Sequence, residues 1–189
     1  MRLIPVVLLL SLLAGSGTAG AQNPQVRKGF TAAVGLGVGS AGLSCDGCAS
    51  DRASGGGLRF MFGGALKPNL VLAGEGEGWS KTDLDGSEST ITWTSFVTQW
   101  YPKQASGFFV KAGLGISAIS IATRSAGRTD RLETFAPGLV AGAGYDIRVG
   151  RNFSLTPYAT LLYAARAGSF YGQSAGGNLL HIGLATTWH

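Results

Sequence analysis

The sequence predicts an all-β chain that folds as an eight-stranded antiparallel up-and-down transmembrane β-barrel. Three observations favour this fold class. Apolar residues alternate with small or polar residues in eight segments, an export signal precedes them, and the connections between them alternate between short and long. Alternation with a period of two puts one row of side chains on each face of a strand, and a membrane barrel needs one apolar row and one polar row.

The first 21 residues have the features of a secretory signal peptide. Arg2 supplies a positive charge, and residues 4–13 form an apolar stretch that is too short to cross a bilayer as a helix. The residues up to Ala21 match the small-residue cleavage pattern. We therefore expect cleavage near Ala21, a signal peptide over residues 1–21 and a single barrel domain over residues 22–189.

Composition supports a narrow barrel. Glycine accounts for 31 of 189 residues and is spread through the apolar segments. The interior of a small barrel is only just wide enough for side chains, so small residues are needed inside. The net charge of +5 does not indicate nucleic-acid binding, because the basic residues are scattered along the chain instead of forming one stripe. A soluble exported β-sandwich is the architectural alternative.

Each predicted strand shows the two-residue period. The clearest, residues 108–117, alternates large apolar residues with Lys111, Ser117 and glycines. The least regular, residues 90–101, has threonines in one row, and Phe96 falls among them. The eight predicted strands cover residues 30–40, 56–66, 69–79, 90–101, 108–117, 134–148, 153–166 and 180–188.

The connections alternate strictly in length. Short turns are predicted at residues 66–69, 102–107 and 150–152. Long polar loops are predicted at residues 42–55, 80–89, 123–131 and 167–178. This alternation is typical of an up-and-down barrel with short turns on one rim and outer loops on the other. An even number of strands places both chain ends on the rim with the short turns.

Aromatic residues gather near the predicted strand ends. They are Trp100, Tyr101, Phe108, Tyr145, Phe153, Tyr163 and Trp188. Membrane barrels carry aromatic girdles at both interfaces, so we interpret these residues as girdle positions. The alternative is that aromatic residues are simply common in strands.

Charged residues also fall on rows that are predicted to face the lumen. They are Arg59, Glu75, Glu77, Lys111, Asp146, Arg148 and Arg166. Charges this far from bulk water must be paired or hydrated. We interpret them as an internal salt-bridge network that plugs a narrow lumen. A polar conduit or gate is one alternative, and a catalytic carboxylate pair at Glu75 and Glu77 is another.

Cys45 and Cys48 form a C-x-x-C pair in the first predicted loop. An exported protein meets an oxidising compartment, which favours a local disulfide. A zinc site would need further ligands, and the two histidines, His181 and His189, are predicted to lie far from this loop. A thioredoxin-like site would need a helix start beside a sheet, and no helix is predicted there. We expect no metal and no cofactor.

Several segments resemble the small outer-membrane β-barrel family, the eight-stranded relatives of the OmpA transmembrane domain and OmpW. They are residues 99–102, 108–115, 142–147 and 183–188. In the last of them, Gly183, Leu184, Thr186 and Trp188 resemble the assembly signal of the family. Members usually end on the aromatic residue, whereas here His189 follows it. The resemblance implies outer-membrane location, a monomer, and outer-membrane lipid and the barrel assembly machinery as partners.

The same resemblance implies a structural or surface-interaction role through the long outer loops, without catalysis. An OmpW-like conduit for small or apolar solutes is the alternative, and it would bind a small apolar ligand. Some barrels of this architecture are lipid-modifying enzymes, among them lipid A deacylases with a His-x-Ser pattern on a late strand. The seventh predicted strand has no histidine, and neither Ser169 nor Ser174 has the matching spacing to His181.

Overall fold

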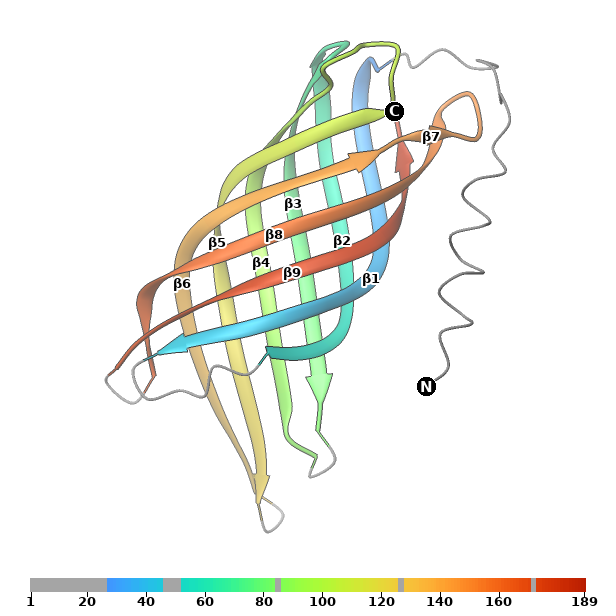
Figure 1. Ribbon diagram of the computed structural model, residues 1–189. Coiled ribbons are helices and arrows are strands. Elements are labelled where there is room, and N and C mark those ends of the chain that lie inside the picture. The colour runs from blue at the N-terminus through green and yellow to red at the C-terminus, as the bar shows by residue number, and fades with distance from the viewer. Residues whose placement is uncertain (1–26, 46–51, 84–85, 126–127, 171–172) are drawn as a thin grey trace, which may run out of the picture.

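The computed structural model of the protein describes residues 27–45, 52–83, 86–125, 128–170 and 173–189 (Figure 1). Its strands are β1 (Gly29–Cys45), β2 (Arg52–Lys67), β3 (Leu70–Thr82), β4 (Glu88–Trp100), β5 (Phe108–Ser125), β6 (Arg128–Tyr145), β7 (Ile147–Arg148), β8 (Phe153–Phe170) and β9 (Gln173–Trp188). The two-residue β7 continues the line of β6 beyond Asp146, so the wall has eight long strands. None of the described residues forms a helix long and apolar enough to cross a membrane.

The strands form one closed antiparallel sheet. Neighbours in sequence pair with each other from β1 to β6, β6 pairs with β8, and β8 pairs with β9. The first and last strands then meet, with Ala32 opposite Trp188 and Cys45 opposite Ala175. The predicted eight-stranded antiparallel up-and-down barrel is confirmed. In Figure 1 the chain end at residue 189 lies on the rim that also carries β7.

The two faces of the wall differ as the alternation predicts. On β1, Val34, Leu36 and Val38 are exposed on the outside, whereas Thr31 and Ala33 are buried inside. The same holds on β5, where Leu114 is exposed and Lys111 is buried. The outer face is therefore an apolar belt, and the inner face holds small, polar and charged residues together with some large apolar ones.

On β4 the apolar row does not face outward, although alternation in residues 90–101 would suggest that it does. Ile91, Trp93 and Val97 are buried in the lumen, and threonines share the outer face with Phe96, which is 82% exposed. Continuous pairing with β3 and β5 fixes this register, with Phe96 opposite both Gly74 and Leu114. The large apolar residues of β4 face in because glycines on neighbouring strands leave space inside the barrel that they fill.

Six of the seven aromatic residues assigned to girdles are exposed. They are Trp100, Phe108, Tyr145, Phe153, Tyr163 and Trp188. The assignment of Tyr101 was wrong, because its side chain is inside the barrel and 1% exposed. Tyr101 directly follows the last residue of β4, and its hydroxyl donates to Asp146 Oδ2 at 2.9 Å.

The two rims of the barrel carry different connections. The turn rim holds the short turns at residues 68–69, 101–107 and 149–152, as predicted. The opposite hairpin rim holds the ends of four hairpins, and the long loops predicted at residues 123–131 and 167–178 were wrong. The loop predicted at residues 80–89 is shortened, because pairing continues to Thr82 opposite Glu88. Pairing continues to Ser125 opposite Arg128 and to Phe170 opposite Gln173. Polar sequence alone suggested loops, but outside an apolar belt a hairpin can pair without apolar rows.

The wall is incomplete between β6 and β8 toward the hairpin rim. These two strands pair from Gly138 opposite Ala164 to Gly144 opposite Tyr158, and no further within the described strands. Residues 128–137 of β6 pair with β5 alone. In Figure 1 the β5–β6 hairpin projects away from the barrel and diverges from the β8–β9 hairpin. Over these residues β5 is therefore the strand neighbour of β6 within the described strands.

Candidate functional site in the lumen

The centre of the lumen holds a cluster of ionisable side chains, the central cluster, made of Arg59, Glu75, Glu77, Lys111 and His181. Arg59 Nη2 lies 2.6 Å from Glu75 Oε2, and Lys111 Nζ lies 2.5 Å from Glu75 Oε1. Lys111 Nζ also donates to Glu77 Oε1 at 3.3 Å. The four charged side chains come from β2, β3 and β5, and each is at most 4% exposed. Two cations balance two carboxylates in one buried group.

His181 links this cluster to the opposite side of the barrel. Its Nδ1 lies 3.0 Å from Glu77 Oε2, and its Nε2 lies 3.3 Å from the hydroxyl of Tyr158. The imidazole fits over two glycines: a Cβ added at Gly37 would lie 2.7 Å from His181 Nε2, and one at Gly57 would lie 2.5 Å away. Glycine at these two positions therefore makes the room that the ring occupies.

The physical effect of this arrangement is to close the barrel. Removing charges from water is costly, and the cost is offset only when geometry and hydrogen bonds are good on every member. Each carboxylate here has at least two partners, and Arg59 also lies over the Tyr158 ring, 4.7 Å from its centroid. Side chains from β2, β3, β5, β8 and β9 are thus joined across the lumen.

A second group, the mouth cluster, closes the turn rim. It consists of Arg27, Tyr101, Asp146, Thr156 and His189. Asp146 accepts hydrogen bonds from the Tyr101 hydroxyl at 2.9 Å and the Thr156 hydroxyl at 2.8 Å. Its Oδ2 lies 3.5 Å from Arg27 Nη2 and 3.2 Å from His189 Nε2. The Asp146 carboxylate is therefore the common partner of all four.

Asp146 lies outside the paired strands, between β6 and β7. Burial by itself raises the pKa of its carboxyl group. The contacts with His189, Thr156 and Arg27 outweigh burial, so the pKa of Asp146 lies below its usual range. The carboxylate is the stable form in this setting.

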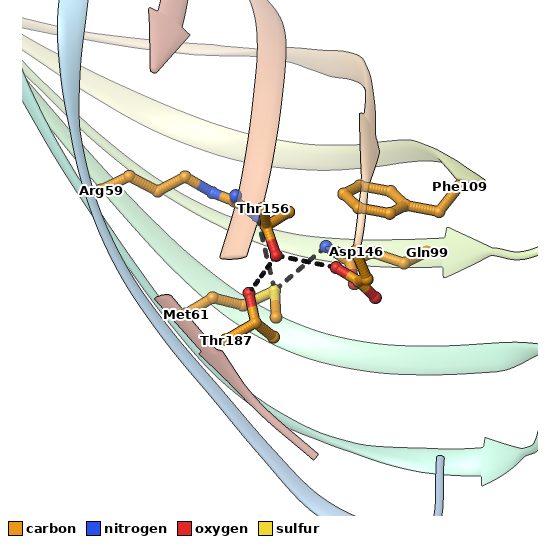
Figure 2. A pocket seen from close by; sticks show the side chains of 7 residues that line it. All are labelled: Arg59, Met61, Gln99, Phe109, Asp146, Thr156 and Thr187. Carbon is orange, nitrogen blue, oxygen red and sulfur yellow. Dashed lines mark hydrogen bonds between the residues drawn. The ribbon is translucent and has the colours of Figure 1, made fainter. Parts of the chain in front are cut away.

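Between the two clusters lies a small pocket, shown in Figure 2. It is lined by Arg59, Met61, Gln99, Phe109, Asp146, Thr156 and Thr187. The hydroxyls of Thr156 and Thr187 are 2.8 Å apart, and Gln99 Nε2 approaches the sulfur of Met61 at 3.3 Å. The pocket is too narrow to admit a water molecule. It is a packing gap in a filled lumen.

Toward the hairpin rim the lumen is apolar. The apolar layer consists of Trp79, Ile91, Trp93, Ile119, Leu162 and Leu179, all buried. Trp79 Nε1 donates to the carbonyl of Gly39 at 3.1 Å. Trp93 packs against Gly138, at the point where the β6–β8 pairing ends, because a Cβ there would lie 2.6 Å from its ring. The lumen is thus filled at three levels.

The structure brings together some of the predicted lumen residues and separates others. Arg59, Glu75, Glu77 and Lys111 meet in the central cluster, and Asp146 lies apart in the mouth cluster. Arg148 is partly exposed on the turn rim, where it donates to the carbonyl of Arg151. The side chain of Arg166, on β8, falls outside the described residues.

The remaining predicted positions have simple locations. Leu184, Thr186 and Trp188 of β9 are exposed on the outer face, and the Trp188 ring meets the Phe153 ring edge-on with centroids 4.7 Å apart. Gly183 belongs to the inner row, because a Cβ there would lie 2.6 Å from the Tyr158 hydroxyl. The proposed disulfide lies outside the described residues, because Cys48 falls in residues 46–51. No three His, Cys, Asp or Glu side chains within the described chain are grouped as a metal site requires.

Sequence reasoning missed the contributions of Arg27, Tyr101 and the two histidines. Arg27 precedes β1 and has no place in its alternation. Tyr101 was assigned to the outside, and His189 appeared only as a residue added after the closing aromatic. One sequence feature could have identified Arg27, Tyr101 and His189. Each lies close to a strand end on the rim with the short turns, and from there a polar side chain can reach back over the lumen.

Comparisons with known proteins identify the fold. No protein-family model matches the sequence, and no curated protein matches it. Among solved structures, Ail of Yersinia pestis, in complex with the heparin analogue sucrose octasulfate, matches with a TM-score of 0.56 at 10% identity, covering 85% of this chain and 99% of Ail. Neisserial surface protein A matches with a TM-score of 0.55 at 15% identity, covering 82% and 95%.

The fold is that of the small outer-membrane β-barrels. The N-terminal β-barrel domain of Pseudomonas aeruginosa OprF also matches, with a TM-score of 0.50 at 12% identity over 86% of this chain and 99% of that domain. At such identities the likeness concerns the fold. The contents of the lumen, and the His189 contact in particular, are read from this chain alone.

Proposed function

We propose that this chain is an outer-membrane β-barrel with a structural or surface-interaction role, carried by the hairpins beyond the hairpin rim. The apolar belt supports the membrane location, because an outer face lined by residues such as Leu36, Leu114 and Ile182 would be unfavourable in water. An export signal before the barrel, with cleavage near Ala21, agrees with this location. The barrel would act as a monomer held by lipid and inserted by the assembly machinery.

The observation that carries the surface role is the projecting β5–β6 hairpin (Figure 1). Over residues 128–137, β6 has β5 as its strand neighbour, and its pairing with β8 begins only at Gly138. A strand at the edge of a sheet can accept a strand from another chain. The closed lumen supports the same conclusion, because charge pairs and tryptophans occupy the space that a solute would need.

The surface role is tested by shortening the hairpin. A variant in which residues 120–133 are replaced by Asn-Gly leaves Ile119 opposite Thr134, keeps the β6–β8 pairing and removes the outer part of the projecting hairpin. A matched control shortens the β8–β9 hairpin by replacing residues 168–175 in the same way. Cells that display each chain are compared for attachment to surfaces coated with protein, with heparin or with a lawn of cells. Equal attachment by wild type and the β5–β6 variant on every surface would overturn the surface role.

The second candidate is a conduit for small apolar solutes, favoured by the gap in the wall. The β6–β8 pairing ends where Trp93 packs against Gly138, and the lumen on that side is lined by the apolar layer. A solute would have to displace Trp93 or its neighbours, because these side chains are buried in contact with one another. This requirement makes the conduit the weaker candidate.

Transport measurements separate the two functions. In planar bilayers the closed barrel should pass no resolvable ion current, and vesicles that contain it should take up octane no faster than protein-free vesicles. A Trp93→Ala variant is the control for sensitivity, because it opens the apolar layer beside the gap. Faster octane uptake by wild type than by protein-free vesicles would favour the conduit. The proposal includes no catalysis, since both ring nitrogens of His181 contact residues of the barrel.

A further inference from the structure

The mouth cluster joins the two ends of the barrel domain through one carboxylate. Arg27 precedes β1, the first strand, and His189 follows β9, the last strand. Both side chains approach Asp146 Oδ2, at 3.5 Å and 3.2 Å. Both are buried, Arg27 being 1% and His189 7% exposed.

Further contacts hold each end in place. The Arg27 guanidinium carbon lies 3.5 Å from the centroid of the Tyr101 ring, and its two Nη atoms donate to the carbonyls of Gln104 and Ser106 in the turn before β5. The backbone N–H of His189 donates to the carbonyl of Asn152 in the turn before β8. Arg27 and His189 are thus fixed to two different turns, with Asp146 between them.

Closure of the barrel is what brings these ends together. Trp188 lies opposite Ala32 on β1 and opposite Phe153 on β8, so His189 follows a strand end that is paired on both sides. Arg27 lies just before the start of β1. The contacts of Asp146 with Arg27 and with His189 therefore come from the two sides of the seam between β1 and β9.

We propose that Asp146 is a closure lock: it captures Arg27 and His189 when the seam between β1 and β9 closes, holds that seam shut at the turn rim, and seals the mouth of the lumen. The residue after the closing aromatic thus has a defined role. His189 is the part of the lock that the last strand carries. The lock is independent of which surface or solute the hairpins serve.

Seam stability tests the lock. His189→Ala, Asp146→Asn and the double variant are compared for their rates of unfolding in urea-containing detergent. Each single variant should unfold faster by about tenfold, the order expected when a contact with a buried charge is lost. The double variant should unfold no faster than Asp146→Asn alone, because Asp146→Asn already disrupts the contact that His189→Ala removes. Additive effects, or no effect of His189→Ala, would overturn the lock. If Asp146→Asn fails to fold, His189→Gln replaces it: a side chain that can still donate a hydrogen bond to Asp146 should unfold more slowly than His189→Ala, and equal rates would overturn the lock.

Sealing of the mouth is a separate readout that general destabilisation does not mimic. Thr187 lines the pocket beside Asp146 and is 4% exposed. A Thr187→Cys reporter, with Cys45 and Cys48 replaced by serine, is labelled with a water-soluble maleimide in native detergent. Adding His189→Ala should raise the labelling rate about tenfold. Asp83→Asn, which breaks the exposed Lys81–Asp83 ion pair at the other rim, is the matched control and should leave the rate unchanged. Equal rates with and without His189→Ala would overturn the sealing role.

Discussion

Lys111 depends on its neighbours more strongly than a surface lysine does. Its ammonium is buried against Glu75 and Glu77, and Arg59 is in the same group. Removing one member of a buried charge group leaves its partners uncompensated, whereas removing a matched pair leaves the group balanced. The lumen should therefore tolerate paired changes better than single ones.

Lys111→Met should lower the free energy of unfolding by about 3–5 kcal/mol, because it leaves two carboxylates facing one arginine. Adding Glu75→Gln restores the charge balance and should recover part of that loss. Lys103→Met, in the exposed turn at the turn rim, should change stability little. Urea unfolding in lipid vesicles measures all three. A double variant that is less stable than Lys111→Met would contradict the charge balance described here.

The glycines beneath His181 provide a second test at this scale. Gly57→Ala should lower stability by about 1–3 kcal/mol, because the new methyl would meet the imidazole in a packed lumen. Its neighbour Gly56 faces the other way, and a Cβ there meets nothing within 4 Å. Gly56→Ala is therefore the matched control and should be close to neutral. Equal losses in the two variants, measured by unfolding in vesicles, would mean that the ring is not seated on Gly57.

The lowered pKa of Asp146 predicts the direction of a pH effect. A carboxylate whose pKa is lower in the folded state stabilises the fold above its unfolded pKa, and this stabilisation is lost as the pH falls through the folded value. The difference in unfolding free energy between wild type and Asp146→Asn should thus be full at pH 7 and shrink below about pH 4. Other carboxylates titrate in both proteins and cancel. A difference that stays constant down to pH 2 would contradict this account.

The sequence located the charges of the lumen but not their partners. Alternation along a strand says that Glu75 and Lys111 face inward, yet their contact also depends on how β3 and β5 lie across the barrel. His181 is 104 residues from Glu77 in sequence, and no local pattern links them. The Arg27 and His189 contacts were equally out of reach, because both residues lie outside the alternating strands.

At the scale of elements, alternation predicted which strands exist and failed where polarity was taken for irregular structure. The β5–β6 and β8–β9 hairpins continue as paired strands through segments that polar composition had marked as loops. Alternation also gave the wrong outer face for β4. The glycines of neighbouring strands leave space in the narrow lumen, and Trp93 and Ile91 fill this space. The two-residue period of the sequence predicted that these segments are strands. Where each strand ends, and which row of side chains faces the lumen, depended also on the strands beside it.

The outer face of β5 gives the clearest test of which side chains face lipid. Leu114 is 67% exposed in the middle of the apolar belt. Leu114→Arg should cost about 2–4 kcal/mol of folding free energy in vesicles, the usual cost of arginine at the bilayer midplane. Thr82→Arg, exposed at the end of β3 on the hairpin rim, should cost only about 0–1 kcal/mol. Equal costs at the two positions would mean that the belt does not face lipid.

At the scale of the whole molecule, closure of the sheet and filling of the lumen act together. Every long strand is paired on both sides in the middle of the wall, and side chains from four strands meet in the central cluster. Local opening of one strand would break pairing with two neighbours and also expose buried charges. We therefore expect the barrel to open in a single step at high temperature and not by gradual fraying.

This coupling predicts the behaviour of the whole chain in detergent. The protein extracted from membranes should migrate differently on a gel with and without boiling, because a closed barrel resists detergent until heat breaks the sheet. Lys111→Met should lower the temperature at which the unheated band is lost, and Lys103→Met should not. An identical mobility before and after boiling, with the protein in the soluble periplasmic fraction, would contradict both the membrane location and the mechanical role given to the filled lumen. If both proteins show the mobility shift and Lys111→Met loses its unheated band at the same temperature as wild type, the barrel fold would stand. The central cluster would then not contribute to its resistance to heat.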